Sequence, residues 1–207
     1  MNENHAKLCP SPEWADHIQN EILPPLTSGL SLGGHLLEIG PGPGAATEWL
    51  RHRVGRLTAI EVDPAAADKL TGRFAGSNVE IVTGDATRLT FADSSFDSVG
   101  TFTMLHHVPT VPLQFRVLAE AYRVLRPGGV LFGSDSLASS GLHEFHADDT
   151  YNPVEPASLL SRLQALGFGK ITIAVDDVLT FTAHRPEPDA GGYGRDGSGP
   201  ECQEGAA

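Results

Sequence analysis

The chain has 207 residues, of which 40% are hydrophobic, and this suits one globular domain with a core of its own. Its 26 acidic residues outnumber the 14 basic ones, for a formal net charge of −12, so we expect neither nucleic acid nor an anionic membrane as a partner. No apolar run is long enough for a membrane span, the first ten residues lack the apolar stretch of a signal peptide, and Cys9 and Cys202 lie at opposite ends. These features predict a cytoplasmic protein without a disulfide framework.

Short β-branched runs alternate with helical stretches along most of the chain, which is typical of βαβ units and a parallel sheet. A first helix is expected to begin at Ser11–Pro12 and to end at Pro24–Pro25. Strands are then expected at 35–40, 56–62, 78–84, 96–102 and 129–135, and helices between them at 45–52, 65–74 and 113–125.

The last part of the chain predicts a reversed strand. Residues 136–153 are polar and irregular in pattern, and a helix at 156–166 follows them. The final two strands, 170–177 and 178–185, have almost nothing between them, so only an antiparallel hairpin can join them. We therefore expect an α/β, doubly wound sheet of seven strands with the last strand antiparallel. The domains would be an N-terminal helical cap segment (1–33), a main domain (34–185) and a disordered, acidic, Gly/Pro-rich tail (186–207).

A glycine-rich loop follows the first strand, in the sequence LLEIGPGPGAAT of residues 36–47. A strand, a glycine-rich turn and a helix N-terminus together hold nucleotide-like ligands, and Gly40, Gly42 and Gly44 would form the turn. The lysine of a triphosphate-binding loop is missing, while the glycine spacing does satisfy the dinucleotide pattern. However, Pro41 and Pro43 have no N–H to offer a pyrophosphate, so the loop favours a ligand without phosphate.

Three acidic residues sharpen this interpretation. Glu38, just before the loop, would favour an ammonium group over a pyrophosphate. Glu61 ends the second strand, where an acid can accept hydrogen bonds from ribose hydroxyls, whereas Asp63 is better suited to cap the next helix. Asp85 follows the third strand and could accept a hydrogen bond from an adenine amino group, while the N–H of Ala86 could donate to a ring nitrogen. Alternatively, Asp85 could serve only to stabilise a turn. S-adenosylmethionine matches these residues, because it is a phosphate-free nucleoside joined through a sulfonium to an amino acid with an ammonium group.

Six motifs in order, LLEIGPGPG, AIEVD, GDAT, FDSV, MLHHV and RVLRPGG, resemble the class I S-adenosylmethionine-dependent methyltransferases over about residues 34–185. The resemblance is closest to the small-molecule, type 11-like branch that includes quinone- and lipid-modifying enzymes. It implies a Rossmann-like sheet in the order 3-2-1-4-5-7-6, with methyl transfer to a small-molecule acceptor by in-line displacement. It also implies a set of cofactor contacts: the three loop glycines at the methionine part, Glu61 at the ribose, Asp85 and Ala86 at the adenine, and the backbone of Thr101 and Phe102.

Enzymes of this class that methylate exocyclic amines of bases carry Asn/Asp-Pro-Pro-Tyr/Phe after the fourth strand. Here that stretch is Thr101-Phe102-Thr103-Met104, which argues against DNA or RNA amino methylation. Two other functions stay open: an NAD(P)-dependent oxidoreductase on a similar fold, and a non-catalytic module that only binds S-adenosylmethionine.

Histidines supply the candidate catalytic groups. His106 and His107 follow the fourth strand and could act as a general base, or could simply cap the next turn and pack against the cofactor. His143 and His146 lie in the polar segment before the last helix, in a pattern that suits a solvated lid better than a metal site, so no metal is expected. Either of them, or Tyr151, could contact the substrate from this lid.

Overall fold

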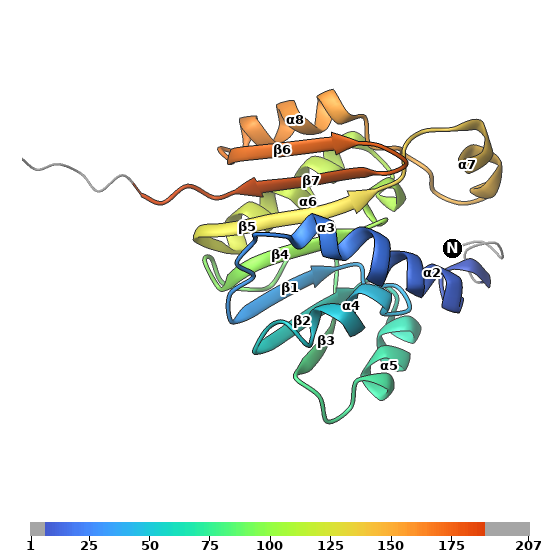
Figure 1. Ribbon diagram of the computed structural model, residues 1–207, viewed down its shortest axis with the longest axis horizontal. Coiled ribbons are helices and arrows are strands. Elements are labelled where there is room, and N and C mark those ends of the chain that lie inside the picture. The colour runs from blue at the N-terminus through green and yellow to red at the C-terminus, as the bar shows by residue number, and fades with distance from the viewer. Residues whose placement is uncertain (1–6, 189–207) are drawn as a thin grey trace, which may run out of the picture.

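The structure is a computed structural model that describes residues 7–188 (Figure 1). The first six residues of the predicted cap segment and residues 189–207 of the predicted tail lie outside the described residues. None of the described helices is long and apolar enough to cross a membrane.

The centre of the molecule is one seven-stranded sheet in the order β3-β2-β1-β4-β5-β7-β6. The strands are β1 (His35–Ile39), β2 (Arg56–Glu61), β3 (Val79–Thr83), β4 (Phe96–Phe102), β5 (Leu125–Asp135), β6 (Gly169–Val175) and β7 (Leu179–His184). β7 runs antiparallel to both of its neighbours, and the pairs among β1 to β5 are parallel. The predicted α/β fold, the strand order and the reversed last strand are therefore confirmed.

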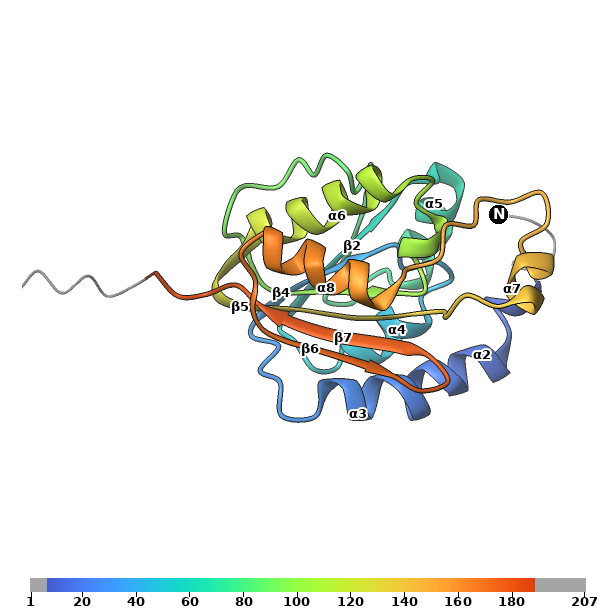
Figure 2. The same ribbon diagram turned by 90° about the horizontal axis from the view of Figure 1, so that it is seen from above.

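Helices cover both faces of the sheet (Figure 2). The helices after the glycine loop are α4 (Ala45–Leu50), α5 (Pro64–Arg73), α6 (Val111–Val124), α7 (Ser140–Phe145) and α8 (Pro156–Ala165). One apolar cluster joins the sheet to α6 and α8 and includes Leu118 and Leu163, while a second joins it to α4 and the N-terminal helices. Short α7 falls within the segment expected to be irregular, where Ser139 caps it by accepting from the N–H of Leu142 at 3.1 Å.

The N-terminal helix does not end at Pro24–Pro25, and that prediction is wrong. The chain is helical through α2 (Pro12–Asp16), a π-helical stretch (His17–Ile22) and α3 (Leu23–Thr27). The two prolines occupy the first turn of α3, and the π turn before them sends the N–H of Leu23 to the carbonyl of Ile18. The N–H groups of a helix's first turn have no partner within the helix, so prolines are tolerated there and the helical path continues past them. Ile18 and Leu23 are buried against the same core as β1 and β5, so the cap segment and the main domain share one core.

Candidate functional site

The predicted cofactor residues lie at the carboxyl ends of neighbouring parallel strands. The glycine loop follows β1, Glu61 ends β2, Asp85 follows β3 and Thr101 lies near the end of β4. β1 lies between β2 and β4, so the chain order reverses there, and open α/β sheets bind ligands at such a point.

The glycine loop has almost no free donors. Pro41 and Pro43 lack an N–H, while the N–H groups of Gly40 and Gly44 donate to the carbonyls of Ile60 (3.0 Å) and Pro41 (2.9 Å). Within the described loop, residues 40–44, the N–H of Gly42 alone remains for a ligand. A loop of this kind cannot surround a phosphate with donors, so the structure strengthens the argument against a pyrophosphate.

Each of the three loop positions requires glycine, but for a different structural reason. All three have positive φ values, +69° at Gly40, +53° at Gly42 and +87° at Gly44. A Cβ at Gly40 would collide with Met104, and one at Gly44 would lie 2.9 Å from Cε2 of Phe74, whereas one at Gly42 would meet nothing within 4 Å. Gly42 is therefore the position where the backbone faces open space, in which a ligand can approach it closely.

Glu38 is a buried acid with an unsatisfied oxygen. Its side chain is 1% exposed, and Oε2 has no hydrogen-bond partner among the described residues. Burial raises the pKa of Glu38 to about 7, with help from the charge of Glu61, while the hydroxyl of Thr47 opposes part of that shift. A carboxylate in this position is stabilised by a cationic group placed next to it.

The sequence offers Glu61 and Asp63 for two roles, a contact with ribose and the cap of the next helix. Asp63 caps α5, because its Oδ1 accepts from the N–H groups of Ala65 at 2.8 Å and Ala66 at 3.3 Å. Glu61 is 9% exposed, and its Oε1 accepts from the N–H of Asp63 at 3.1 Å. Only Glu61 is therefore left to face a ligand at the end of β2, and its contact with ribose stays a prediction.

Asp85 lies on an exposed turn and forms that turn itself. Its Oδ1 accepts from the N–H of Thr87 at 2.8 Å, and this hydrogen bond lowers the pKa of Asp85 below its ordinary value. The alternative role of a turn aspartate is thus fulfilled, and the contact of Asp85 with adenine stays a prediction. Ala86 packs against the main apolar cluster.

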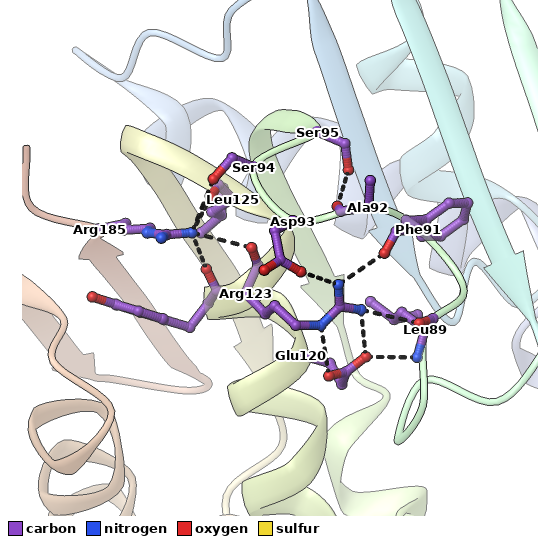
Figure 3. A network of polar contacts seen from close by, with 11 residues as sticks. Leu89, Phe91, Ala92, Asp93, Ser94, Ser95, Glu120, Arg123, Leu125 and Arg185 are labelled. Carbon is purple, nitrogen blue, oxygen red and sulfur yellow. Dashed lines mark hydrogen bonds and ion pairs between the residues drawn. The ribbon is translucent and has the colours of Figure 1, made fainter.

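A polar network holds residues 89–95 in the long connection between β3 and β4 (Figure 3). Glu120 of α6 accepts from the N–H of Leu89 at 2.8 Å, and Arg123 donates to the carbonyls of Leu89 (3.0 Å) and Phe91 (2.8 Å). Arg123 also pairs with Glu120 and Asp93. No local sequence pattern marks Glu120 or Arg123, because their contacts with Leu89 and Phe91 join segments about 30 residues apart.

Thr101 and Phe102 end β4 with both side chains turned inward. Thr101 is 2% exposed, and Phe102 is in edge contact with Phe132 of the core, with ring centroids 5.7 Å apart. The side chain of Phe102 is thus held in the core, and the backbone contacts of both residues with the cofactor stay predictions. The next residue, Thr103, has φ of +49°, which is strained for a β-branched side chain and marks the turn that leads to the histidines.

His106 is buried and fixed by Asp135, at the end of β5. Its Nδ1 lies 2.5 Å from Oδ1 of Asp135, and the two side chains are 3% and 0% exposed. His107 lies beside it with ring centroids 4.1 Å apart, and His146 approaches from the end of α7 at 5.0 Å. The sequence paired His146 with His143, but His143 is exposed and His146 instead joins His106 and His107. Burial lowers the pKa of His146 below its ordinary value. Asp135 could not be singled out from the sequence, because an acid at the end of a strand carries no distinctive motif.

Known proteins share this architecture. A family model described as a methyltransferase domain covers residues 37–133. A phthiotriol/phenolphthiotriol dimycocerosates methyltransferase of Mycobacterium leprae is 34% identical over 118 residues, 56% of this chain and 43% of that protein. A ribosomal RNA small subunit methyltransferase A of Geobacter sulfurreducens is 46% identical over 54 residues, 26% of this chain and 20% of that protein. An S-adenosylmethionine-dependent methyltransferase structure from Methanosarcina mazei has a TM-score of 0.61 at 20% identity, covering 80% of this chain and 98% of that one.

Residues 37–133 match a methyltransferase domain, and the sheet that contains them shares its fold with the Methanosarcina mazei structure. The chain spans less than half the length of these two curated relatives. One of them is named for a lipid substrate and the other for ribosomal RNA, so the comparisons leave the acceptor of this methyltransferase domain open.

The residues of the methyltransferase domain fit S-adenosylmethionine. The cofactor has no phosphate, and the glycine loop has one free N–H; the cofactor carries an ammonium group, and Glu38 has a buried oxygen without a partner. The hydroxyl of Thr101 is a second buried polar atom without a partner among the described residues. These features support the assignment of S-adenosylmethionine as the cofactor.

A small cavity of about 90 Å³ adjoins the histidines of the methyltransferase domain. Its apolar and aromatic lining residues are Leu8, Trp14, Leu142 and Phe145. The remaining lining residues are Cys9, Thr103, Ser136 and the three clustered histidines. A larger cavity of about 460 Å³ lies between the N-terminal helix and β6–β7, but none of the predicted site residues lines it. The smaller cavity lies at the ends of β4 and β5, next to the predicted cofactor residue Thr101.

Proposed function

We propose that the chain transfers a methyl group from S-adenosylmethionine to a small acceptor held in the cavity beside His106 and His107. The observation that carries the proposal is the pairing of a donor-poor glycine loop with the buried, unpartnered oxygen of Glu38. Together they favour a phosphate-free cationic nucleoside over NAD(P), which an oxidoreductase on a similar fold would need.

The acceptor side supports a small, partly apolar molecule. Four apolar or aromatic side chains line the cavity, and its other lining groups are two hydroxyls, three imidazoles and the thiol of Cys9. The nucleic-acid alternative, which the ribosomal RNA relative raises, finds little support in the charge of −12. In addition, several arginines are already paired with acids, among them Arg51, Arg123 and Arg126.

In the proposed reaction, S-adenosylmethionine supplies an activated methyl group. Glu38 would hold its amino group and Glu61 its ribose, while Gly42 would let the backbone approach closely. The apolar walls of the cavity would exclude water, and His106, oriented by Asp135, would form the wall next to the acceptor with His107 beside it. The chain's contribution is mainly alignment, because the methyl group needs no further activation.

Two measurements test this proposal. Calorimetric titration should show S-adenosylhomocysteine binding at micromolar or lower Kd and no NADH binding; the reverse would support the oxidoreductase and refute the proposal. A transfer assay with radiolabelled methyl groups should then compare a panel of small aromatic and lipid alcohols with ribosomal RNA and DNA. Label in nucleic acid alone would refute the small-molecule acceptor, and binding without transfer to any acceptor would favour the non-catalytic module.

A further inference from the structure

We propose that His106, His107 and His146 bind one divalent transition-metal ion, with Zn²⁺ the best fit, at the wall of the acceptor cavity. Metal binding itself does not depend on the proposed function; only its effect on the acceptor does. The proposal departs from the sequence expectation of no metal, because the three ligands come from segments that no local spacing connects.

The three side chains already converge. One nitrogen from each ring lies within 4.8 Å of the others, and His106 and His146 are buried. Two nitrogens on one tetrahedral Zn²⁺, each at ~2.0–2.1 Å, lie ~3.3 Å apart. The rings would therefore have to approach one another by at most ~1.5 Å. Helix α7, which precedes His146, contains no buried residue, so it can shift by this amount without disturbing the core.

The tautomers of two histidines suit metal binding. Nδ1 of His146 lies 2.6 Å from the carbonyl oxygen of Leu142, which can only accept, so this nitrogen carries the hydrogen. Nδ1 of His106 likewise lies 2.5 Å from the carboxylate of Asp135. In each neutral ring Nε2 then carries the lone pair. Metal-bound histidines usually donate their other N–H to a carboxylate or a backbone carbonyl, and here one ring does each.

The buried carboxyl group of Asp135 adds an electrostatic reason. Its side chain is 0% exposed, and its closest charge-bearing partner is His106. A general base would need one oriented imidazole, and a helix cap would need none. Neither a general base nor a helix cap explains why His146, directly after α7, lies against His106 and His107. A metal cation held by all three rings would also balance the negative charge of Asp135.

The site would be of the open type. Three protein ligands leave a fourth tetrahedral position, and the cavity lined by Thr103 and Ser136 lies next to the histidines. An acceptor hydroxyl or enolate oxygen could occupy this position, where the metal would lower its pKa and favour the deprotonated nucleophile. This step rests on the proposed function, and it narrows the acceptor to one that is methylated on, or next to, an oxygen.

The test uses the full chain without a histidine tag, stripped of metal with a chelator. Zn²⁺ should bind with 1:1 stoichiometry in calorimetry, and Co²⁺ should give the visible absorption of a tetrahedral site. Both signals should be lost in His146→Ala and in His107→Ala. Asp135→Asn, which keeps all three ligands, should weaken Zn²⁺ binding about 10–100-fold. His143→Ala is the matched control, because His143 is exposed in the same segment, and it should leave both signals unchanged.

S-adenosylhomocysteine binding by each variant shows that the fold and the cofactor site are intact. The inference is overturned if the wild type binds no stoichiometric Zn²⁺ at 100 μM, a concentration about 100-fold above a micromolar Kd. It is also overturned if His146→Ala binds Zn²⁺ as tightly as the wild type. If the metal-free protein still transfers methyl groups in either case, the proposed function stands and only the metal site falls.

Discussion

Replacement of Glu38 by glutamine should stabilise the protein and at the same time weaken its hold on the cofactor. Glu38 is buried, and burial raises its pKa to about 7 from the ordinary value of 4.5. The unfolded chain loses this proton at a lower pH than the folded protein does. The contribution of Glu38 to stability is therefore full below pH 4.5 and is lost as the pH rises to about 7.

The size of this loss follows from the two pKa values. The interval between 4.5 and about 7, at about 1.4 kcal/mol for each pH unit, corresponds to about 3 kcal/mol at pH 8. At pH 5 the loss of stability from the same linkage is only about 1 kcal/mol. Glutamine has nearly the same shape and never ionises, so Glu38→Gln should raise the free energy of unfolding by about these amounts.

Cofactor binding should change in the opposite direction. If the ionised carboxylate of Glu38 holds the ammonium group, the wild type must deprotonate Glu38 to bind S-adenosylhomocysteine. With a pKa of about 7, only about a tenth of the molecules are ionised at pH 6, so the Kd should rise about tenfold between pH 8 and pH 6. The Glu38→Gln variant should bind more weakly at pH 8, and this pH dependence should disappear.

Urea unfolding without ligand at pH 5 and pH 8 measures the first effect, and calorimetry between pH 6 and pH 8 measures the second. The matched control is Glu80→Gln, an exposed glutamate of β3, which should change stability by less than about 0.5 kcal/mol. A variant no more stable than the wild type at pH 8 would refute the electrostatic argument. A more stable variant that binds S-adenosylhomocysteine as tightly as the wild type would remove Glu38 from the cofactor site.

Three further predictions separate the cofactor site from its scaffold. Gly42→Ala and Gly76→Ala both place a Cβ in open space at positive φ, so each should cost about 1–2 kcal/mol in urea unfolding, but only Gly42→Ala should weaken S-adenosylhomocysteine binding, by about tenfold or more. Asp63→Ala should lose about 1 kcal/mol of helix capping with little change in Kd, whereas Glu61→Gln should weaken binding and leave stability nearly unchanged; the opposite result would exchange their roles. Arg123→Met should destabilise by about 1–2 kcal/mol, and a change in urea unfolding below about 0.5 kcal/mol would show that this network does not hold the loop after β3.

The sheet could be predicted from the sequence because its signals are local. Each strand is a short β-branched run between turn residues, and the short gap between the last two strands permits only a hairpin. The end of the first helix could not be predicted in this way. Pro24 and Pro25 stop an ordinary α-helix, but in the folded backbone they occupy the first turn of α3, directly after a π turn, and the helical path reaches Thr27.

The acceptor side of the site could be predicted only in part. His106 and His107 stand out as a dipeptide after a strand, but Asp135 ends a different strand and becomes visible only when β4 and β5 pair. The spacing of His143 and His146 suggested that they belong together, because residues three apart share a helix face. Helix α7 ends at Phe145, however, and the turn that follows directs His146 alone toward the other two histidines.

The glycine loop shows what a structure adds to a correct prediction. The sequence alone removes two donors, those of Pro41 and Pro43, and this leaves three N–H groups that a small anion could still use. The fold then commits the N–H groups of Gly40 and Gly44 to carbonyls of the protein itself. With one loop donor left and a buried carboxylate at Glu38, two residues before the loop, a phosphate would gain little hydrogen bonding. The loop therefore selects its ligand both by the N–H donors that it lacks and by the charge of Glu38. Of these two features, only the charge can be removed by a single isosteric substitution, Glu38→Gln.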